Sequence, residues 1–197
     1  MPFLSPTDLL PLASYCFVMS GTPGPNNVLL ASSGANFGYR RALPLILGIQ
    51  AGGALLTLLT CLGLGSLFAA FPVLHQILRV TGALYLIWLA WKLSAMSVAE
   101  AGQPMTMLQA ILFQAINPKS WVKAITLASV FMPTGLSVPL GALLVTLTSI
   151  MVGLPVSSTW ALFGVAIRRF LQDPLKRRLF NLSMGGTLVL LAISFLR

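Results

Sequence analysis

Two short polar motifs interrupt an otherwise apolar sequence, and both have the residue types needed to bind a charged substrate. The first is Gly21–Asn27 (GTPGPNN), and the second is Asn117-Pro118-Lys119. Proline inside a helix removes one backbone donor and displaces the carbonyl four residues earlier, and in hydrocarbon such groups need partners from protein, water or ligand. The carbonyls freed at each motif can therefore accept hydrogen bonds from an ammonium group.

The side chains at these motifs add the complementary chemistry. Gly24 permits a tight turn, and Asn26 or Asn27 can cap the half-helix that follows. A lysine near the middle of an apolar run costs at least about 2.5–3.5 kcal/mol, so Lys119 should face a partner or a water-filled cavity. Together with a half-helix N-terminus, Lys119 suits a carboxylate, so both ends of a zwitterionic amino acid are provided for. The predicted substrate-binding residues are Pro23, Gly24, Pro25, Asn26, Asn27, Asn117, Pro118 and Lys119.

Simpler interpretations of these residues stay open. Proline-kinked transmembrane helices are often purely structural. Lys119 could instead extend to the membrane interface, with Lys123 one turn further along as its partner. The spacings Gly34-xxx-Gly38 and Gly48-xxx-Gly52 indicate helix packing or a loop more than a binding site.

The composition indicates a membrane protein. Hydrophobic residues make up 57% of the 197 residues and charged residues 8%, against about half and about a quarter in soluble domains. The 12 basic residues exceed the 3 acidic ones, but they are scattered between apolar runs rather than gathered on one polar face, which excludes a nucleic-acid binder. Cys16 and Cys61 lie far apart with no Cys or His spacing typical of a metal site, so we expect no disulfide, no metal and no cofactor.

The apolar runs predict an all-α polytopic membrane protein with six transmembrane helices. A bilayer core about 30 Å thick needs roughly 20 apolar residues in a helix, and a seventh crossing inside the fifth run would be short of residues. We expect the first run to be a mature helix rather than a signal peptide, because no Lys or Arg precedes it and it continues into a Pro-Gly-Pro sequence. The six runs cover about 9–33, 42–71, 73–96, 107–132, 136–167 and 179–196.

The order of the runs predicts a single integral membrane domain built as a 3+3 inverted repeat. Runs one and four carry the breaks, runs two and five are long, and runs three and six contain the small pairs Gly82-Ala83 and Gly185-Gly186. Three crossings in each half mean that the second half enters the membrane from the opposite side. Repeat A covers about 1–100 and repeat B about 101–197, with helices one and four broken.

The basic residues orient this fold, because Lys and Arg in short loops favour the cytoplasmic side. Eight of them follow runs one, three and five, whereas only Arg79 and Arg197 lie on the opposite side. Both termini are therefore predicted to be periplasmic. The eight predicted cytoplasmic residues are Arg40, Arg41, Lys92, Arg168, Arg169, Lys176, Arg177 and Arg178.

The motifs together resemble those of the LysE/RhtB family of amino-acid exporters. Besides the two polar motifs, the resemblance rests on Gly38–Ala42 (GYRRA) and on Gly82–Leu86 (GALYL) with Trp88-Leu89, and it covers nearly the whole chain. The Pro-Asn-Asn form is most similar to the branch that exports cysteine and O-acetylserine, with the homoserine/threonine branch next. The resemblance implies efflux of small amino acids or their derivatives across the bacterial inner membrane, coupled to the proton gradient. It also implies that the two proline motifs, Pro23–Asn27 and Asn117–Lys119, are conserved elements of the family.

Proton coupling lacks an obvious carrier in this sequence. The acidic residues Asp8, Glu100 and Asp173 all fall at helix edges or in loops, so none supplies a carboxylate at the membrane centre. Lys119 or the amino group of the substrate would have to carry the proton instead. The identity of the amino acid, the coupling ion and the formation of a homo-oligomer stay open.

Two functions of other classes compete with export. One is an intramembrane enzyme, either a thiol-redox carrier or a lipid-modifying protein, which the missing cysteine pair and the missing intramembrane His/Asp/Glu cluster disfavour. The other is a non-transporting assembly partner built on the small-residue spacings.

Overall fold

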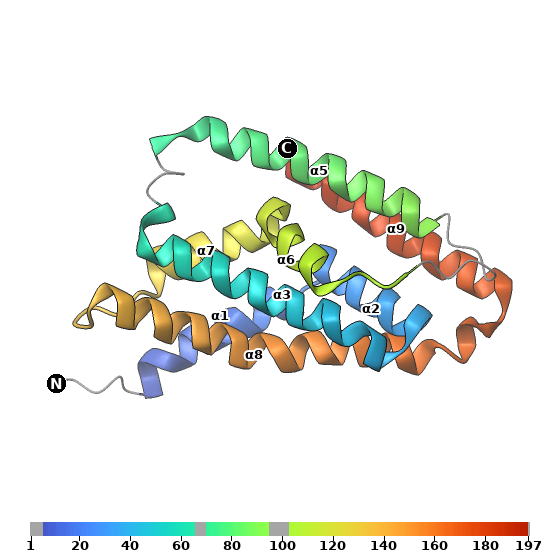
Figure 1. The fold of residues 1–197 in the computed structure, drawn as a ribbon, viewed down its shortest axis with the longest axis horizontal. Helices are drawn as coiled ribbons and strands as arrows, with labels where there is room; N and C mark the ends of the chain where they lie inside the picture. The colour runs from blue at the N-terminus through green and yellow to red at the C-terminus, as the bar shows by residue number, and fades with distance from the viewer. Residues whose placement is uncertain (1–5, 66–69, 95–102, 197) are drawn as a thin grey trace.

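Helices form all the regular structure in residues 6–65, 70–94 and 103–196, the part of the chain that the computed structural model describes (Figure 1). The elements in chain order are α1 Pro6–Gly21, α2 Pro25–Phe37, α3 Tyr39–Leu59, the π-helical turn η1 Thr60–Leu64, α5 Pro72–Ser94, α6 Met107–Ile116, α7 Pro118–Val130, α8 Val138–Ile167, the 3-10 turn η2 Phe170–Gln172 and α9 Pro174–Leu196.

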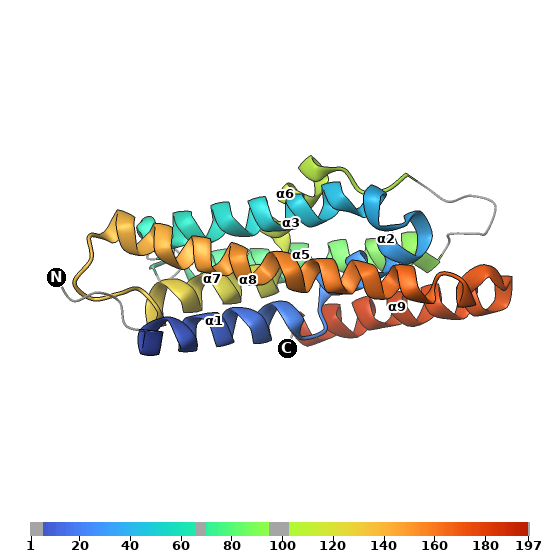
Figure 2. The same cartoon turned by 90° about the horizontal axis from the view of Figure 1, so that it is seen from below.

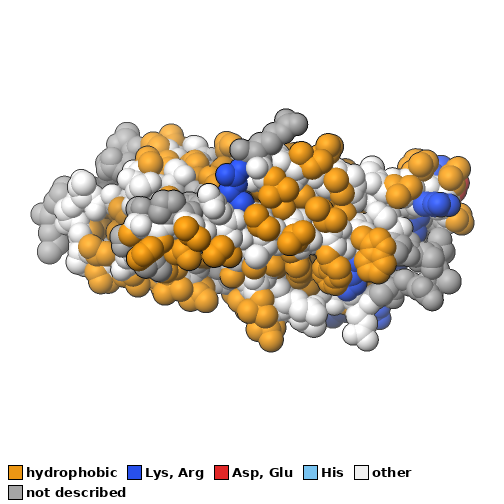
Figure 3. Space-filling view, turned by 90° about the horizontal axis from the view of Figure 1, so that it is seen from above, with side chains coloured by type: hydrophobic (Ala, Val, Ile, Leu, Met, Phe, Trp, Pro, Cys, Tyr) orange, Lys and Arg blue, Asp and Glu red, His pale blue; other side chains and the backbone are white. Residues whose placement is uncertain are grey.

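The helices confirm a multi-pass membrane protein. In the described part of the chain, four helical segments are long and apolar enough to span a bilayer, and two shorter apolar helices end at the proline motifs. Figure 3 shows one face of the molecule, on which hydrophobic side chains cover the middle. The four spans are Tyr39–Leu64, Gln76–Ser94, Val138–Ile167 and Pro174–Leu196.

Two predicted helix boundaries are wrong by several residues. Helix α3 begins at Tyr39 rather than at residue 42, because Gly38 (φ 82°) alone turns the chain between α2 and α3. Helix α9 begins at Pro174 rather than at residue 179, because the Oδ1 atom of Asp173 accepts from the backbone N–H of Leu175 at 2.8 Å. Arg40, Arg41 and three basic residues of α9 therefore lie within the starts of helices rather than in connections.

Helix α8 is a single helix of 30 residues that continues through Pro155, so the fifth run contains one crossing. The interrupted pair α1–α2 packs along α8, and the pair α6–α7 packs along α3. Helices α3 and α8 also contact each other, whereas α5 and α9 pair along one side of the bundle (Figure 1). Both long helices therefore line the space between the two interrupted pairs.

The basic helix ends gather at one end of the molecule. Helices α2, α5 and α8 end there, and α3 and α9 begin there, on the right in Figures 1 and 2. On the face drawn in Figure 3, most of the visible Lys and Arg side chains lie at this same end. The charge asymmetry predicted from sequence thus becomes an asymmetry between the two ends of the bundle.

Glycines let the helices approach closely. A Cβ atom at Gly34 would overlap the carbonyl oxygen of Ala161, and one at Gly164 would overlap that of Ala31. At the α3–α6 contact, a Cβ atom at Gly48 would lie 2.5 Å from the carbonyl oxygen of Met107. The small-residue spacings serve helix packing and the turn at Gly38, in agreement with the sequence prediction.

Substitution of Gly164 by Ala tests the α2–α8 contact. The added methyl group meets backbone rather than a flexible side chain, so we expect Gly164→Ala to cost about 1–3 kcal/mol of stability. The thermal unfolding midpoint in detergent measures this loss. Gly186→Ala is the matched control, because nothing lies within 4 Å of its added Cβ atom; equal midpoints for the two variants would contradict the close packing.

Candidate functional site

Both proline motifs interrupt the helices at the predicted positions. Helix α1 ends at Gly21, and α2 starts with Pro25 in its first turn. Helix α6 ends at Ile116, and Pro118 starts α7 after one extended residue, Asn117. Because proline has no N–H to give and its φ suits a first helical turn, each proline starts a new helix rather than continuing the old one.

The lysine of the second break occupies the free carbonyls of the first. Lys119 Nζ donates to the carbonyl oxygen of Thr22 at 2.7 Å, to Thr22 Oγ1 at 2.8 Å and to the carbonyl oxygen of Pro23 at 3.4 Å. Gly24 provides the room, since a Cβ atom there would lie 2.9 Å from Lys119 Nζ. The acceptors that the sequence predicted for a substrate ammonium thus hold an ammonium of the protein.

Three amide side chains also join the two breaks. Asn26 Nδ2 donates to Gln114 Oε1 at 3.1 Å, and Gln114 Nε2 donates back to Asn26 Oδ1 at 3.2 Å. Asn117 Nδ2 donates to the same Asn26 oxygen at 3.3 Å. Ser120 Oγ adds a 2.7 Å hydrogen bond to Gln114 Oε1. Gln114 and Asn117 are each only 1% exposed, so these hydrogen bonds replace water that the site excludes.

The expectation that Asn26 or Asn27 caps α2 is wrong. Gly24 is the N-cap residue of α2 and has no side-chain cap. Asn27 Nδ2 instead donates to the carbonyl oxygens of Ser20 and Thr22, each at 2.8 Å. Side chains in a first helical turn lean toward the N-terminus, which directs this amide at the last carbonyls of α1. The capping asparagine is at the other break, where Asn117 Oδ1 accepts from the backbone N–H of Lys119 at 3.1 Å.

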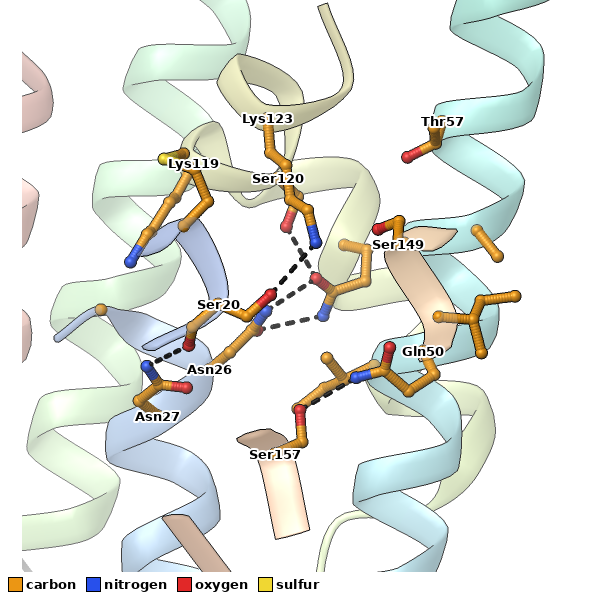
Figure 4. A pocket seen from close by; sticks show the side chains of 17 residues that line it. Ser20, Asn26, Asn27, Gln50, Thr57, Lys119, Ser120, Lys123, Ser149 and Ser157 are labelled. Atoms are coloured by element: carbon orange, nitrogen blue, oxygen red, sulfur yellow. Dashed lines mark hydrogen bonds between the residues drawn. The ribbon is translucent and has the colours of Figure 1, made fainter. Parts of the chain in front are cut away.

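The breaks enclose a polar cavity of about 70 Å³ (Figure 4). Four of the predicted site residues line it, namely Gly24, Asn26, Asn27 and Lys119. The other four, Pro23, Pro25, Asn117 and Pro118, form the interrupted backbone beside it. The remaining lining side chains come from α1, α3, α6, α7 and α8: Met19, Ser20, Ile49, Gln50, Gly53, Ala54, Thr57, Gln114, Ser120, Lys123, Ser149, Ile150 and Ser157.

Lys123, which the sequence suggested only as a partner for Lys119 if both extend to the interface, also lines the cavity. It lies one turn after Lys119 on the same face of α7, and its Nζ donates to Ser20 Oγ at 3.2 Å. Figure 4 shows this side chain directed toward Ser20 inside the cavity. The spacing of two lysines at i and i+4 within an apolar run was the sequence signal, since a shared helix face implies a shared environment.

The opposite wall was also missed. Gln50 Nε2 on α3 donates to Ser157 Oγ on α8 at 2.9 Å, joining the two long helices across the cavity. Gln50 and Thr57 are seven residues apart in an apolar helix, so they lie on one face. That periodicity could have indicated the polar wall.

The charges in the cavity are all positive. Its lining contains two lysines and no carboxylate, among the residues whose side chains the structure describes. Asp173 caps α9, and the side chains of Asp8 and Glu100 lie outside the described residues. In the same part of the chain, no group of His, Cys, Asp and Glu side chains could hold a metal ion. The cavity therefore favours an anionic group on its ligand.

A double-mutant cycle tests the amide cluster. Asn26→Ala and Gln114→Ala each remove one partner of a reciprocal pair, so each leaves the other partner unsatisfied and should cost about 1–3 kcal/mol. The double variant should then be less destabilised than the sum, with a coupling of at least about 0.5 kcal/mol. Denaturant unfolding in detergent measures all three variants; additive losses would contradict the direct contact.

Comparisons with known proteins give the family and the relatives that the chain resembles. Residues 17–197 match the family described as LysE type translocator. The chain is 29% identical over 174 residues to the cysteine/O-acetylserine efflux proteins of Escherichia coli (strain K12) and Shigella sonnei (strain Ss046). These alignments cover 86% of this chain and 89% of each relative. No solved structure matches the chain significantly.

Proposed function

Because the chain belongs to the LysE-type translocator family, whose members are transporters rather than enzymes, we propose that it exports a small zwitterionic amino acid or derivative. The proposed direction is out of the bacterial cytoplasm across the inner membrane, in line with the efflux activity in the names of its relatives. The observation that carries the proposal is the meeting of two broken helices at a polar, cationic cavity inside an apolar bundle. Discontinuous helices that meet near the bilayer midplane are typical of substrate sites in secondary transporters.

The cavity can bind both charged groups of an amino acid. The carboxylate would pair with Lys119 and Lys123, whose ammonium groups have only neutral partners in the described structure. The substrate ammonium would take the carbonyl oxygens of Thr22 and Pro23, which now accept from Lys119. Substrate binding would thus exchange one ammonium for another at the first break and release Lys119 to the carboxylate.

This exchange offers a physical basis for alternating access. Lys119 links the α6–α7 break to the α1–α2 break directly, so its release would loosen the contact between two separate parts of the bundle. A ligand shifts a conformational equilibrium only through such differential contacts. The change in hydrogen-bond partners at Lys119 would supply this difference in contacts between the two conformations.

The helix packing supports six crossings arranged as a 3+3 inverted repeat, with α1–α2, α3–η1 and α5 in repeat A and α6–α7, α8 and α9 in repeat B. The broken helix of each half packs on the long helix of the other, α1–α2 on α8 and α6–α7 on α3. Helix α5 pairs with α9, its counterpart. A pseudo-two-fold axis in the membrane plane would produce this exchange of partners. Both repeats then belong to one membrane domain.

The lining favours a small substrate with a polar side chain. A cavity of about 70 Å³ holds a few water molecules, and serines and amides form much of its wall. Cysteine and O-acetylserine, which the relatives' names give as their substrates, have these properties, as do homoserine and threonine. Proton coupling would act through the two lysines or the substrate amino group, because the described lining offers no carboxylate.

Substitution of the cavity residues tests the site. We expect Lys119→Gln, Lys123→Gln and Asn27→Ala to abolish export, with membrane abundance near the wild-type level. Hydrogen bonds to charged groups contribute about 1.5–3 kcal/mol, so each lysine substitution should reduce export more than about tenfold. Asn27→Ala removes the two hydrogen bonds that hold the last carbonyls before the first break. Uptake of labelled amino acids into energised everted vesicles measures the activity. Lys176→Gln is the matched control, since Lys176 lies over the Phe170 ring at the bundle end. Unchanged export by the Lys119 and Asn27 variants would refute the site.

Reporter fusions test the orientation. The basic end of the bundle should face the cytoplasm, and α1 begins at the opposite end (Figure 1), so six crossings would place both termini in the periplasm. A reporter active only outside the cytoplasm, fused after Arg197, should therefore be active, and one active only inside should be silent. The reverse pattern would contradict the orientation while leaving the site untouched.

A further inference from the structure

A second cationic cavity lies at the basic end of the bundle. It has a volume of about 590 Å³ and lies between the end of α2, the end of α8, the turn η2 and the first turns of α9. Three arginines line it, Arg168, Arg169 and Arg177, together with the amides of Asn36 and Gln172. It shares no lining residue with the cavity that contains Lys119.

Two side-chain nitrogens of one of these arginines are shielded from solvent without a partner. The Nε and Nη2 atoms of Arg177 are shielded from solvent and have no hydrogen-bond partner in the described structure. A guanidinium always carries its charge, so burial of its N–H groups is unfavourable unless an acceptor reaches them. The nearby carboxylate of Asp173 is directed at the start of α9, where Oδ1 accepts from the backbone N–H of Leu175 and Lys176. The acceptor that Arg177 needs is therefore not supplied by this carboxylate.

The membrane-orienting role of basic residues does not explain this arrangement. Arg178 is the next residue on α9, is exposed to solvent and does not line the cavity. An exposed arginine satisfies the preference for positive charge on one side of a membrane as well as a buried one does. The shielding of two Arg177 nitrogens in a cavity lined by two further arginines needs another cause.

We propose that this cavity binds a phosphate group. Guanidinium groups match phosphate oxygens through paired N–H donors, and a phosphate can engage several arginines at once. Three guanidinium groups offer more N–H donors than the two oxygens of a carboxylate can accept, which favours a phosphate group with its four oxygens. The cavity lies at a bundle end, where helices leave the apolar region, so the phosphate can come from an anionic phospholipid headgroup or from free phosphate in solution.

Thermal unfolding of the purified full chain in a neutral detergent tests the proposal. Two titrations distinguish the sources: phosphatidylglycerol against phosphatidylcholine, and inorganic phosphate against acetate at constant ionic strength. We expect a saturable rise in the unfolding midpoint with phosphatidylglycerol or phosphate. Arg177→Gln should weaken the apparent affinity at least about tenfold, whereas Arg178→Gln should change it by less than about twofold.

Each outcome decides a separate point. A response to phosphatidylglycerol alone identifies a lipid headgroup, and a response to both identifies the phosphate group itself. Equal effects of Arg177→Gln and Arg178→Gln, an equal response to acetate, or no saturable response would overturn the site. If Arg177→Gln does not fold, Arg168→Gln takes its place against the same control. The measurement involves no transport, so its failure would leave the proposed export function standing.

Discussion

The interaction between the Lys119 ammonium and the carbonyl oxygens of Thr22 and Pro23 is the constraint around which the bundle is organised. A helix that breaks inside hydrocarbon exposes carbonyls that lipid cannot satisfy, and a lysine at the same depth needs acceptors. Each of these groups would be costly alone. Because the two breaks lie opposite each other, the lysine of one donates to the carbonyl oxygens of the other. This contact requires the two halves of the chain to meet at the breaks.

The surrounding helices make that meeting possible. Gly34 and Gly164 let α2 lie directly against α8, and Gly48 does the same for α3 against α6. Close packing brings the broken backbones near enough for side-chain contact and keeps lipid out. The hydrogen bond between Gln50 and Ser157 joins α3 to α8 on the opposite side of the cavity. The polar network is therefore enclosed by apolar packing, which strengthens its hydrogen bonds and makes any unsatisfied member costly.

The sequence indicated the parts of this arrangement that depend on local chemistry. Helix α8 continues through Pro155, so a proline alone does not locate a break. Both breaks could be located because proline stands there beside glycine or asparagine, and glycine spacing indicates helix contact. The roles of Asn27 and Lys123 depend instead on which helix end lies opposite, and that follows from packing between distant segments. The early starts of α3 and α9 were missed because each depends on a single residue. One glycine with positive φ and one capping aspartate shorten connections that the hydropathy pattern leaves long.

The charge in the cavity constrains how any transport through it can be coupled. A zwitterion carries no net charge, so its arrival leaves the two positive charges of Lys119 and Lys123 uncompensated overall. Those two side chains are also the only titratable groups that line the cavity in the described structure. In the proposed site, a proton exchanged for substrate would reside on one of these amines or on the substrate's own. Lys119 and the substrate ammonium would compete there for the same carbonyl acceptors, so loss of a proton by either amine would favour the other at that position. Competition at the first break would then couple proton release to substrate binding without a buried carboxylate.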